Sequence, residues 1–251
     1  MSKYALTISY IGTAYAGWQI QQNAPSVQGV MCDACSRAFD CKVSVTGCSR
    51  TDSGVHANEY LCVLDFEGKH NNIPAERLPL ALNALLPNDI SVLNCEMADD
   101  NFHPRYSTYG KEYVYKIYNN AIRNPFWHNR AYLYPIPLDI ETMNKAANLF
   151  CGEHNFCAFM ATGSKIENTV RTIYSARVYK DADTVNFAVS GNGFLYNMVR
   201  IMAGTLIDVG KGKISANDIP KIINSKSREK AGNTLPACGL YLNKILKERP
   251  I

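Results

Sequence analysis

The chain opens with an alternation of apolar and polar residues. In residues 3–10 (KYALTISY) every second side chain is apolar, which predicts a β-strand with one buried face. A loop containing Gly12 and Gly17 follows, and Ser26 then precedes a stretch whose apolar residues recur at helical spacing. This pattern predicts a helix beginning after Ser26, because a serine hydroxyl can accept a hydrogen bond from the first free amides of a helix.

The rest of the first half continues as a mixture of strands and helices. Short apolar runs at either end of residues 47–60 predict two strands that this segment connects. Further along, the pattern predicts a helix over 76–86 and strands over 91–95 and 111–118.

The second half repeats this alternation without recognisable sequence similarity to the first. Helices are predicted over 139–150 and 194–209, and strands over 169–179 and 184–190. A last helix is expected to begin at Ser215, in a capping box with Asp218, and the residues GLYLNKIL predict a closing strand.

This order of elements predicts an α+β fold in two halves of similar size. The loop over 119–137 is rich in Pro and Asn and is the best candidate for the boundary. We therefore predict an N-terminal domain over residues 1–120 and a C-terminal domain over residues 121–251.

Length and composition fit a globular protein. With 251 residues, of which 47% are hydrophobic and 19% charged, the chain can bury a substantial core. Its net charge is +4, so any surface for a polyanion has to be a local patch. The pattern predicts neither a signal peptide nor a membrane span. The nine cysteines are odd in number and irregularly spaced, which favours reduced thiols in the cytoplasm over a disulfide framework.

Several familiar cofactor and metal motifs are incomplete. Residues 191–196 (GNGFLY) have two glycines of a dinucleotide fingerprint but a tyrosine at the third position, and residues 209–215 (VGKGKIS) lack the spacing of a P-loop. Cys32 and Cys35 form a CxxC pair inside the first predicted helix, but no second pair completes a tetrahedral site. We therefore expect no bound metal, and we interpret the CxxC pair as part of the core.

The segment over 47–60 (GCSRTDSGVHANEY) concentrates polar residues between two strands. One interpretation is a plain turn, in which Asp52 accepts hydrogen bonds from backbone amides and Gly54 adopts a positive φ. In the other, Arg50 and Asp52 extend to the same face, with Thr51 on the opposite one. A guanidinium beside a carboxylate favours the ionised carboxylate, which a nucleophile or a base requires. The segment alone leaves both interpretations open.

Other polar and aromatic residues are not required by the fold. Arg200 belongs to the helix predicted over 194–209 and lies away from the apolar stripe of that helix, on the side of Tyr196. An isolated arginine at such a position is usually solvated. The strand over 111–118 places Tyr113 and Tyr115 on one face, as in many cores. The loop FHPRY sets cationic side chains beside aromatic ones, a combination that binds unpaired bases and phosphates. Its residues are Phe102, His103, Pro104, Arg105 and Tyr106.

Nine segments, in the same order, resemble motifs of the TruA-type tRNA pseudouridine synthases. In chain order they are YIGTAYAGWQIQ, SVQG, SRTDSGVHA, LNALLPNDISV, FHPRY, KEYVYKIYN, CGEHNFCAF, FLYNMVRIMAGTLIDVG and PACGLYL. The chain departs from the family pattern at Pro104 and Asn155. It also departs at Ser49 and Ser53, where the family has Gly and Ala, which suggests a subfamily with a different target set.

The resemblance implies an enzyme that isomerises uridine to pseudouridine in the anticodon stem-loop of tRNA, at tRNA positions 38–40. It implies that Asp52 is the catalytic nucleophile and that Arg200 pairs with it. It further implies that the ring of Tyr113 stacks on the uracil and that Arg50 supports the flipped nucleotide. Because the reaction has no net redox change and no group donor, no cofactor or metal is implied. The implied fold has antiparallel sheets of two α+β halves joined into one central sheet, with the active-site cleft between the halves.

The resemblance also implies the partners: the anticodon arm of tRNA and a second copy in a homodimer, in the cytoplasm, without membrane or small-molecule cofactor. The FHPRY loop, together with Lys165 and Arg171, matches family segments that contact tRNA. Two alternatives remain from other classes. One is a non-catalytic RNA-binding module of the same fold, and the other is a hydrolase in which Asp52 works with a second carboxylate, for which Glu59 is the only nearby candidate.

Overall fold

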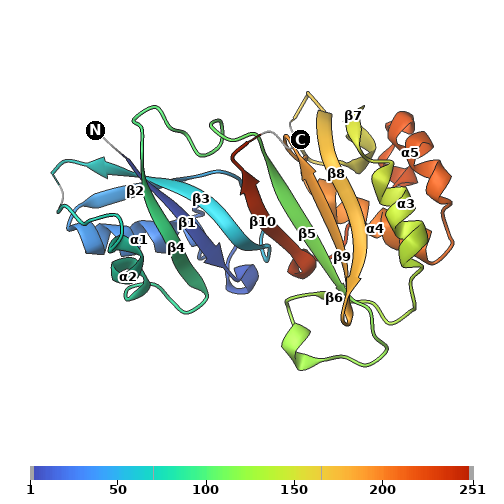
Figure 1. Ribbon diagram of the computed structural model, residues 1–251, viewed down its shortest axis with the longest axis horizontal. Helices are drawn as coiled ribbons and strands as arrows, with labels where there is room; N and C mark the ends of the chain where they lie inside the picture. Colours follow the sequence, from blue (N-terminus) through green and yellow to red (C-terminus); the bar gives the residue numbers. More distant parts are fainter. Residues whose placement is uncertain (1–2, 70, 165, 249–251) are drawn as a thin grey trace. The chain divides into compact units, whose positions relative to one another are not determined.

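The computed structural model describes residues 3–69, 71–164 and 166–248 (Figure 1). The chain divides into two compact units. The first contains the described residues up to Tyr109 and those from Leu242 onward, and the second is Gly110–Tyr241. Strand β10 (Leu240–Leu246) therefore begins in the second unit and ends in the first. Strand β5 (Gly110–Tyr118) belongs to the second unit, whereas the predicted division at residue 120 puts it in the N-terminal half.

The first unit is an antiparallel sheet with two helices against it. Its first four strands, in hydrogen-bonded order, are β4 (Ile90–Ala98), β1 (Lys3–Tyr10), β3 (His56–Glu67) and β2 (Lys42–Gly47). Helix α1 (Val27–Phe39) contacts β2, and helix α2 (Leu78–Asn83) contacts β4 (Figure 1). The β1 side chains predicted to share a face are all buried: Tyr4, Leu6, Ile8 and Tyr10.

Local sequence explains the ends of α1. The Ser26 hydroxyl oxygen accepts a hydrogen bond from the Gly29 amide at 3.2 Å, so the predicted N-cap is confirmed. The helix ends at Phe39 because Asp40 adopts a left-handed conformation with φ of 53°. Helix α2 is shorter than the predicted 76–86, and β4 is longer than the predicted 91–95.

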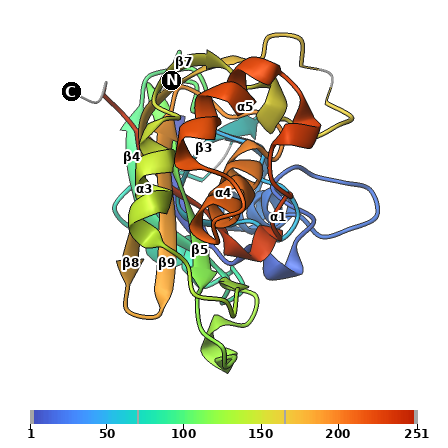
Figure 2. The same ribbon diagram turned by 90° about the vertical axis from the view of Figure 1, so that its right-hand side faces the viewer.

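The second unit is a sheet with helices on one side. Its strands, in hydrogen-bonded order, are β5, β9 (Thr184–Gly191), β8 (Val170–Asp181) and β7 (Gly152–Asn155), with β6 (Tyr132–Leu133) parallel to β5. Helix α3 (Ile140–Asn148) packs on β8, and α4 (Met198–Gly210) contacts α3 and β5. Helix α5 (Ile219–Ser225) lies near β7, as the turned view shows (Figure 2). Strands β6 and β7 were not predicted from the sequence.

Two predicted helix starts in this unit are wrong. Helix α4 begins at Met198, not at residue 194, because Asn197 adopts a left-handed conformation with φ of 59° and interrupts the helical path. Tyr196 therefore lies in the preceding turn, so a helical face shared with Arg200 does not exist. The Ser215 side chain makes no capping hydrogen bond, and α5 begins only after a single 3-10 turn.

The α+β class is confirmed, since each unit combines a sheet with helices. Within the described ranges, no helix is long and apolar enough to cross a membrane. The joining of the two sheets and a cleft between the halves concern the relative placement of the units and stay predictions.

Candidate active site

Arg50 and Asp52 lie in the connection from β2 to β3 in the first unit. The Val55 amide donates a hydrogen bond to the Asp52 carbonyl oxygen at 3.1 Å and closes a tight turn. Gly54 has φ of 77° in this turn, so the positive φ predicted for it is confirmed. The turn-forming interpretation is therefore correct for the backbone, and the turn fixes where the Asp52 side chain begins.

The side chains before and within this turn alternate between interior and surface. Thr51 is only 7% exposed, and its hydroxyl shares a hydrogen bond of 2.8 Å with the hydroxyl of Tyr10 on β1. Arg50 is exposed and Asp52 is half-buried. This pattern agrees with an extended backbone that turns Thr51 inward and its two neighbours outward. The Asp52 side chain thus lies toward the surface, while the neighbouring Thr51 is anchored in the core.

Gly17 allows the first loop of the chain to touch the backbone of this turn. The Trp18 amide donates to the Thr51 carbonyl oxygen at 3.1 Å. Gly17 itself has φ of 94°, and a Cβ added there would lie 3.0 Å from the Asp52 carbonyl carbon and closer still to the Thr51 carbonyl oxygen. Only glycine fits this position without moving the residues that carry the carboxylate.

Tyr15 of the same loop makes a second connection. Its carbonyl oxygen accepts hydrogen bonds from the Gly54 amide and from the Ser53 hydroxyl, each at 3.3 Å. Its own hydroxyl donates to a carboxylate oxygen of Asp89 at 2.7 Å. Burial, followed by this contact with Asp89, raises the pKa of the Tyr15 phenol, which therefore remains a donor. The hydrogen bonds from Ser53 and Gly54 thus attach the turn to the first loop.

A stacked aromatic pair holds the start of the connection. The rings of Trp18 and Tyr60 lie 4.1 Å apart and nearly parallel, and the Tyr60 hydroxyl donates to the Ser49 carbonyl oxygen. Burial raises the pKa of the Tyr60 phenol well above its usual value, so this donor persists at alkaline pH. Gly47 leaves space for both aromatic side chains, because a Cβ there would collide with each of them.

His56, which follows this turn at the start of β3, has a structural role. It is buried at the start of β3, and its Nδ1 accepts a hydrogen bond from the Gly12 amide at 3.0 Å. An accepting Nδ1 requires a neutral imidazole that carries its proton on Nε2. His56 therefore ties the first loop to β3.

Arg200 is the one residue of α4 that is not buried. Its Nε donates to the Leu235 carbonyl oxygen and its Nη1 donates to the Asn197 side-chain oxygen, each at 2.6 Å. Because it is half-buried and held by two short hydrogen bonds, Arg200 is not the freely solvated arginine that its isolation in the sequence suggests. The same Asn197 that delays the start of the helix thus orients its arginine.

Tyr113 and Tyr115 are both buried on β5, as predicted for residues of one face. The Tyr113 ring packs edge-to-face against Phe194 with the centroids 5.1 Å apart. The Tyr115 hydroxyl donates to the Pro236 carbonyl oxygen at 2.7 Å. Arg50 and Asp52 belong to the first unit, while Tyr113 and Arg200 belong to the second, so the pairing of Asp52 with Arg200 stays a prediction.

The FHPRY loop is compact and displays its polar end. The His103 Nδ1 accepts from the Arg105 amide at 3.1 Å, and the rings of His103 and Tyr106 lie 4.5 Å apart. The Arg105 guanidinium lies 5.9 Å from the Tyr106 ring centre, and both side chains are exposed. Pro104 is buried and Phe102 half-buried beneath them. A cation beside an exposed ring suits RNA contact, and that role stays a prediction.

Of the two residues predicted near the loop over 164–171, only one can be placed. Arg171 lies on β8, and its Nη1 donates to the carbonyl oxygens of Asn168 and Val170 at 2.9 Å and 2.6 Å. Burial lowers the pKa of this guanidinium, which nevertheless remains charged. Lys165 lies outside the described residues.

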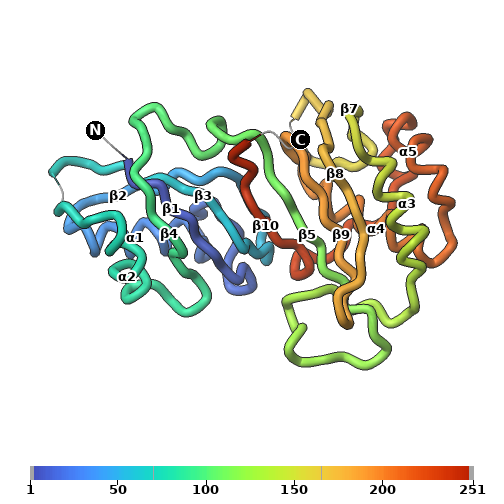
Figure 3. The backbone as a smooth tube through the Cα atoms, in the orientation of Figure 1, coloured from blue at the N-terminus to red at the C-terminus, as the bar shows by residue number. Residues whose placement is uncertain are grey.

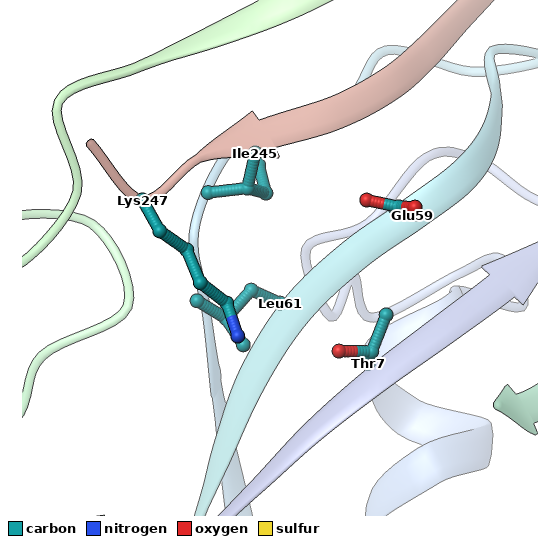
Figure 4. Close-up of a pocket in the computed structure, with 5 residues that line it drawn as sticks. All are labelled: Thr7, Glu59, Leu61, Ile245 and Lys247. Carbon is teal, nitrogen blue, oxygen red and sulfur yellow. The ribbon is translucent and has the colours of Figure 1, made fainter. Parts of the chain in front are cut away.

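Glu59, the second carboxylate that a hydrolase would need, faces a very small hollow. Figure 4 shows it with Thr7, Leu61, Ile245 and Lys247 on the sheet of the first unit. The hollow measures about 30 Å³, which is enough for about one water molecule and far too small for a nucleoside. This hollow beside Glu59 is therefore too small to be the substrate site of a hydrolase.

Sequence reasoning missed the supporting residues Tyr15, Trp18 and Tyr60. The available signal was Gly17 directly before Trp18, because a loop glycine often marks a close backbone approach. Within the part of the chain that the structure describes, no three His, Cys, Asp or Glu side chains gather as metal ligands would.

Comparison with known proteins identifies the class. A family model described as tRNA pseudouridine synthase matches residues 6–107 and 146–245 of the chain. The chain therefore belongs to the tRNA pseudouridine synthase family, as its motifs predict.

Its relatives within this family share one name. The chain is 49% identical to tRNA pseudouridine synthase A of Ruminiclostridium cellulolyticum, an alignment that covers 98% of this chain and 99% of that protein. It is 45% identical to tRNA pseudouridine synthase A of Thermoanaerobacter sp. strain X514 and 44% identical to that of Clostridium acetobutylicum. Each of these two alignments covers 98% of this chain and 100% of the relative.

Proposed function

We propose that the protein isomerises uridine to pseudouridine in tRNA. The observation that carries this proposal is the 49% identity, over 98% of this chain, to a protein named tRNA pseudouridine synthase A. An aspartate on a turn that is hydrogen-bonded to the first loop supports it. In the reaction the N1–C1′ bond of uridine breaks and a C5–C1′ bond forms. The uracil gains a proton on N1 and loses the one on C5, so atoms balance without a cofactor or metal.

Asp52 is the proposed nucleophile. Its carboxylate projects from a turn that is held by the first loop and by a buried threonine, so its position costs little reorganisation when RNA binds. Its partial exposure leaves it accessible to a nucleotide that has left the helical stack. Arg50, exposed beside it, is suited to hold a phosphate or to occupy the vacated position in the stem.

Tyr113 and Arg200 are proposed to complete the site from the second unit. The Tyr113 ring is packed against Phe194, which fixes its plane for stacking on a detached uracil. Arg200 is oriented by Leu235 and Asn197, and a guanidinium held in this way can keep a carboxylate ionised. Retaining the free base and excluding water would prevent hydrolysis of the intermediate.

The substrate is proposed to be the anticodon arm of tRNA. The name of the relatives supports tRNA as the substrate, and the exposed side chains of Arg105 and Tyr106 in the FHPRY loop support contact with nucleic acid. Arg171, which is half-buried on β8, adds a further cation. The anticodon arm is what the resemblance of the motifs implies. With a net charge of only +4, the chain has to bind RNA through such local patches. We further propose that the enzyme acts as a homodimer in the cytoplasm, where tRNA is available to it.

The test is tritium release from unmodified tRNA labelled at C5 of uridine. We expect release by the wild-type protein and none by Asp52→Asn, while the affinity for tRNA persists because phosphate contacts dominate it. Asp33→Asn on the exposed face of α1 is the matched control and should behave as wild type. Measurable release by Asp52→Asn, with deamidation excluded by mass spectrometry, would contradict the assignment.

Neither alternative breaks the C5–H bond, so neither releases tritium to water, and analysis of the RNA products separates them. A binding module would retain tRNA and release no tritium. A hydrolase would leave an abasic site and free uracil, whereas the isomerase leaves the RNA chain and its base content intact.

A further inference from the structure

A long excursion in the second unit plays no part in the proposed site. It connects β5 to α3 over residues 119–137 and projects from the end of the sheet (Figures 1 and 3). Its sequence, NNAIRNPFWHNRAYLYPIP, contains two arginines, one histidine and four aromatic residues, but no aspartate or glutamate. The next acidic residue is Asp139, at the start of α3.

The base of this excursion is firmly attached. The Asn119 side-chain amide donates to the carbonyl oxygens of Tyr134 and Ile136, each at 2.8 Å, and so joins the outgoing limb to the returning one. The Tyr241 hydroxyl of β10 donates to the Arg130 carbonyl oxygen at 2.6 Å. These hydrogen bonds fix both ends of the excursion to the second unit, so its outer side chains have defined positions.

The tip displays a phenylalanine outward for a clear reason. Pro125–Trp127 form one 3-10 turn, which the Asn124 side chain caps by accepting from the Phe126 amide at 3.0 Å. The Trp127 ring packs nearly parallel to Tyr118 of β5, with the centroids 6.2 Å apart. Because its neighbour turns inward, Phe126 turns outward and is 86% exposed. Phe126 is not alone, since Ile122 and Ile136 of the same excursion are 77% and 54% exposed, so the excursion presents several apolar side chains to solvent.

The charges around Phe126 indicate what that occupant is. Arg123, His128 and Arg130 are all exposed on the same excursion. Cationic side chains interleaved with an exposed ring, without any acidic residue among them, complement a polyanion whose bases are free to stack. Single-stranded RNA supplies both kinds of contact, since its phosphates pair with the cationic side chains and its free bases stack on the ring.

We propose that this excursion binds an unpaired segment of the RNA substrate, outside the Asp52 turn, with Phe126 stacked on a base and Arg123 and Arg130 on the flanking phosphates. The inference rests on the proposed function, because it takes the substrate to be RNA. It adds a second contact surface, which would hold the tRNA while the uridine is turned out at the catalytic site.

The experiment compares variants of Phe126 that separate stacking from apolarity. Binding is measured by fluorescence anisotropy with a short single-stranded oligoribonucleotide and with unmodified tRNA. Phe126→Leu keeps an apolar side chain but no ring, so its affinity for the oligoribonucleotide should fall about tenfold. Phe126→Trp keeps a stacking ring and should bind as wild type. Leu80→Ala, at an apolar side chain that is 77% exposed on α2, is the control for exposed apolar surface.

Charge is tested through the salt dependence of binding. Arg123→Gln should reduce the slope of log affinity against log salt concentration by about 1, the effect of losing one phosphate contact. Arg37→Gln on α1 removes the same charge at another exposed position and should leave the slope unchanged.

The outcomes distinguish this inference from the proposed function. The RNA-binding surface would be refuted if Phe126→Leu and the wild-type protein bound the oligoribonucleotide with equal affinity. It would also be refuted if the variants changed the sedimentation coefficient of the protein alone while the affinity for RNA stayed the same. Loss of affinity in Phe126→Leu supports it even if the wild-type protein releases no tritium, a result that would refute the isomerase but not the RNA-binding surface.

Discussion

Replacing Gly17 by alanine should impair catalysis by moving the backbone that carries Asp52. Its backbone has φ of 94°, and the space beside its Cα is filled by the backbone of Thr51 and Asp52. A methyl group there has to push the catalytic turn outward, because no flexible side chain is available to yield. The change therefore acts on the position of the Asp52 carboxylate.

Two costs can be separated for this substitution. The positive φ costs an alanine about 1–2 kcal/mol of folding stability, wherever in the chain it occurs. The collision adds the weakened Trp18–Thr51 hydrogen bond, which contributes about 1 kcal/mol. Relieving the collision displaces the turn by about 1 Å, and a misplacement of this size costs about 100-fold in turnover. We therefore expect Gly17→Ala to lose about 2–3 kcal/mol of stability and about 100-fold in rate.

Gly68→Ala provides the matched control in the same unit. Gly68 has φ of 91°, nearly the same as Gly17, but among the described residues other than its chain neighbours no heavy atom lies within 4 Å of the Cβ that alanine would add. It should therefore lose the 1–2 kcal/mol of the backbone term and keep its full rate. The rate is measured by single-turnover tritium release with saturating enzyme, and the stability by urea unfolding of the same preparations.

The comparison of the two variants decides the outcome. If Gly17→Ala turns over as fast as Gly68→Ala, the first loop does not position Asp52, whatever the two stabilities are. A rate loss equal in both variants would instead trace the defect to reduced stability.

Two further predictions concern the second unit and the core. Arg200→Lys should lower single-turnover tritium release at least tenfold with about 1 kcal/mol of stability lost, because one ammonium group cannot replace the bonds to Leu235 and Asn197; a wild-type rate would refute a role for Arg200. Burial raises the pKa of the Cys35 thiol to about 12 and that of Cys95 to about 11. The contribution of these thiols to the free energy of unfolding is thus fully present below about pH 8.5, where the thiol is protonated in the unfolded chain as well. Above about pH 8.5 the free energy of unfolding falls by ~1.4 kcal/mol per pH unit for each thiol, until the pH reaches the pKa of that thiol in the folded protein. Urea unfolding at several pH values should show a shallower loss for Cys35→Ala; an unchanged pH dependence would contradict this.

Elements with strong local signals could be predicted from the sequence. Residues 3–10 form a strand with the predicted buried face, and Ser26 caps α1, because alternation and capping are properties of neighbouring residues. The start of α4 could not be predicted in this way. Its apolar spacing continues back to Phe194, but Asn197 takes a left-handed conformation and bonds to Arg200, a choice that depends on packing around the helix.

The sequence indicates candidate residues for the site but not the contacts that support them. Local pattern could place Thr51 opposite its neighbours, since that depends only on an extended backbone. The stacking of Trp18 on Tyr60 and the bond from Tyr60 to the Ser49 carbonyl join segments that are far apart in the chain. No spacing rule within either segment specifies such contacts.

Ser53 shows how the structure changes the meaning of a sequence difference. It stands beside Asp52 where the family pattern has alanine, which by itself suggests altered choice of RNA target. Its hydroxyl, however, donates to the Tyr15 carbonyl oxygen at 3.3 Å, a bond that alanine cannot make. The Gly54 amide shares that acceptor, so Ser53 adds a second tether between the same loop and the same turn. The hydroxyl thus adds to the support of the carboxylate, and a different choice of RNA target stays a prediction for Ser49 and Ser53.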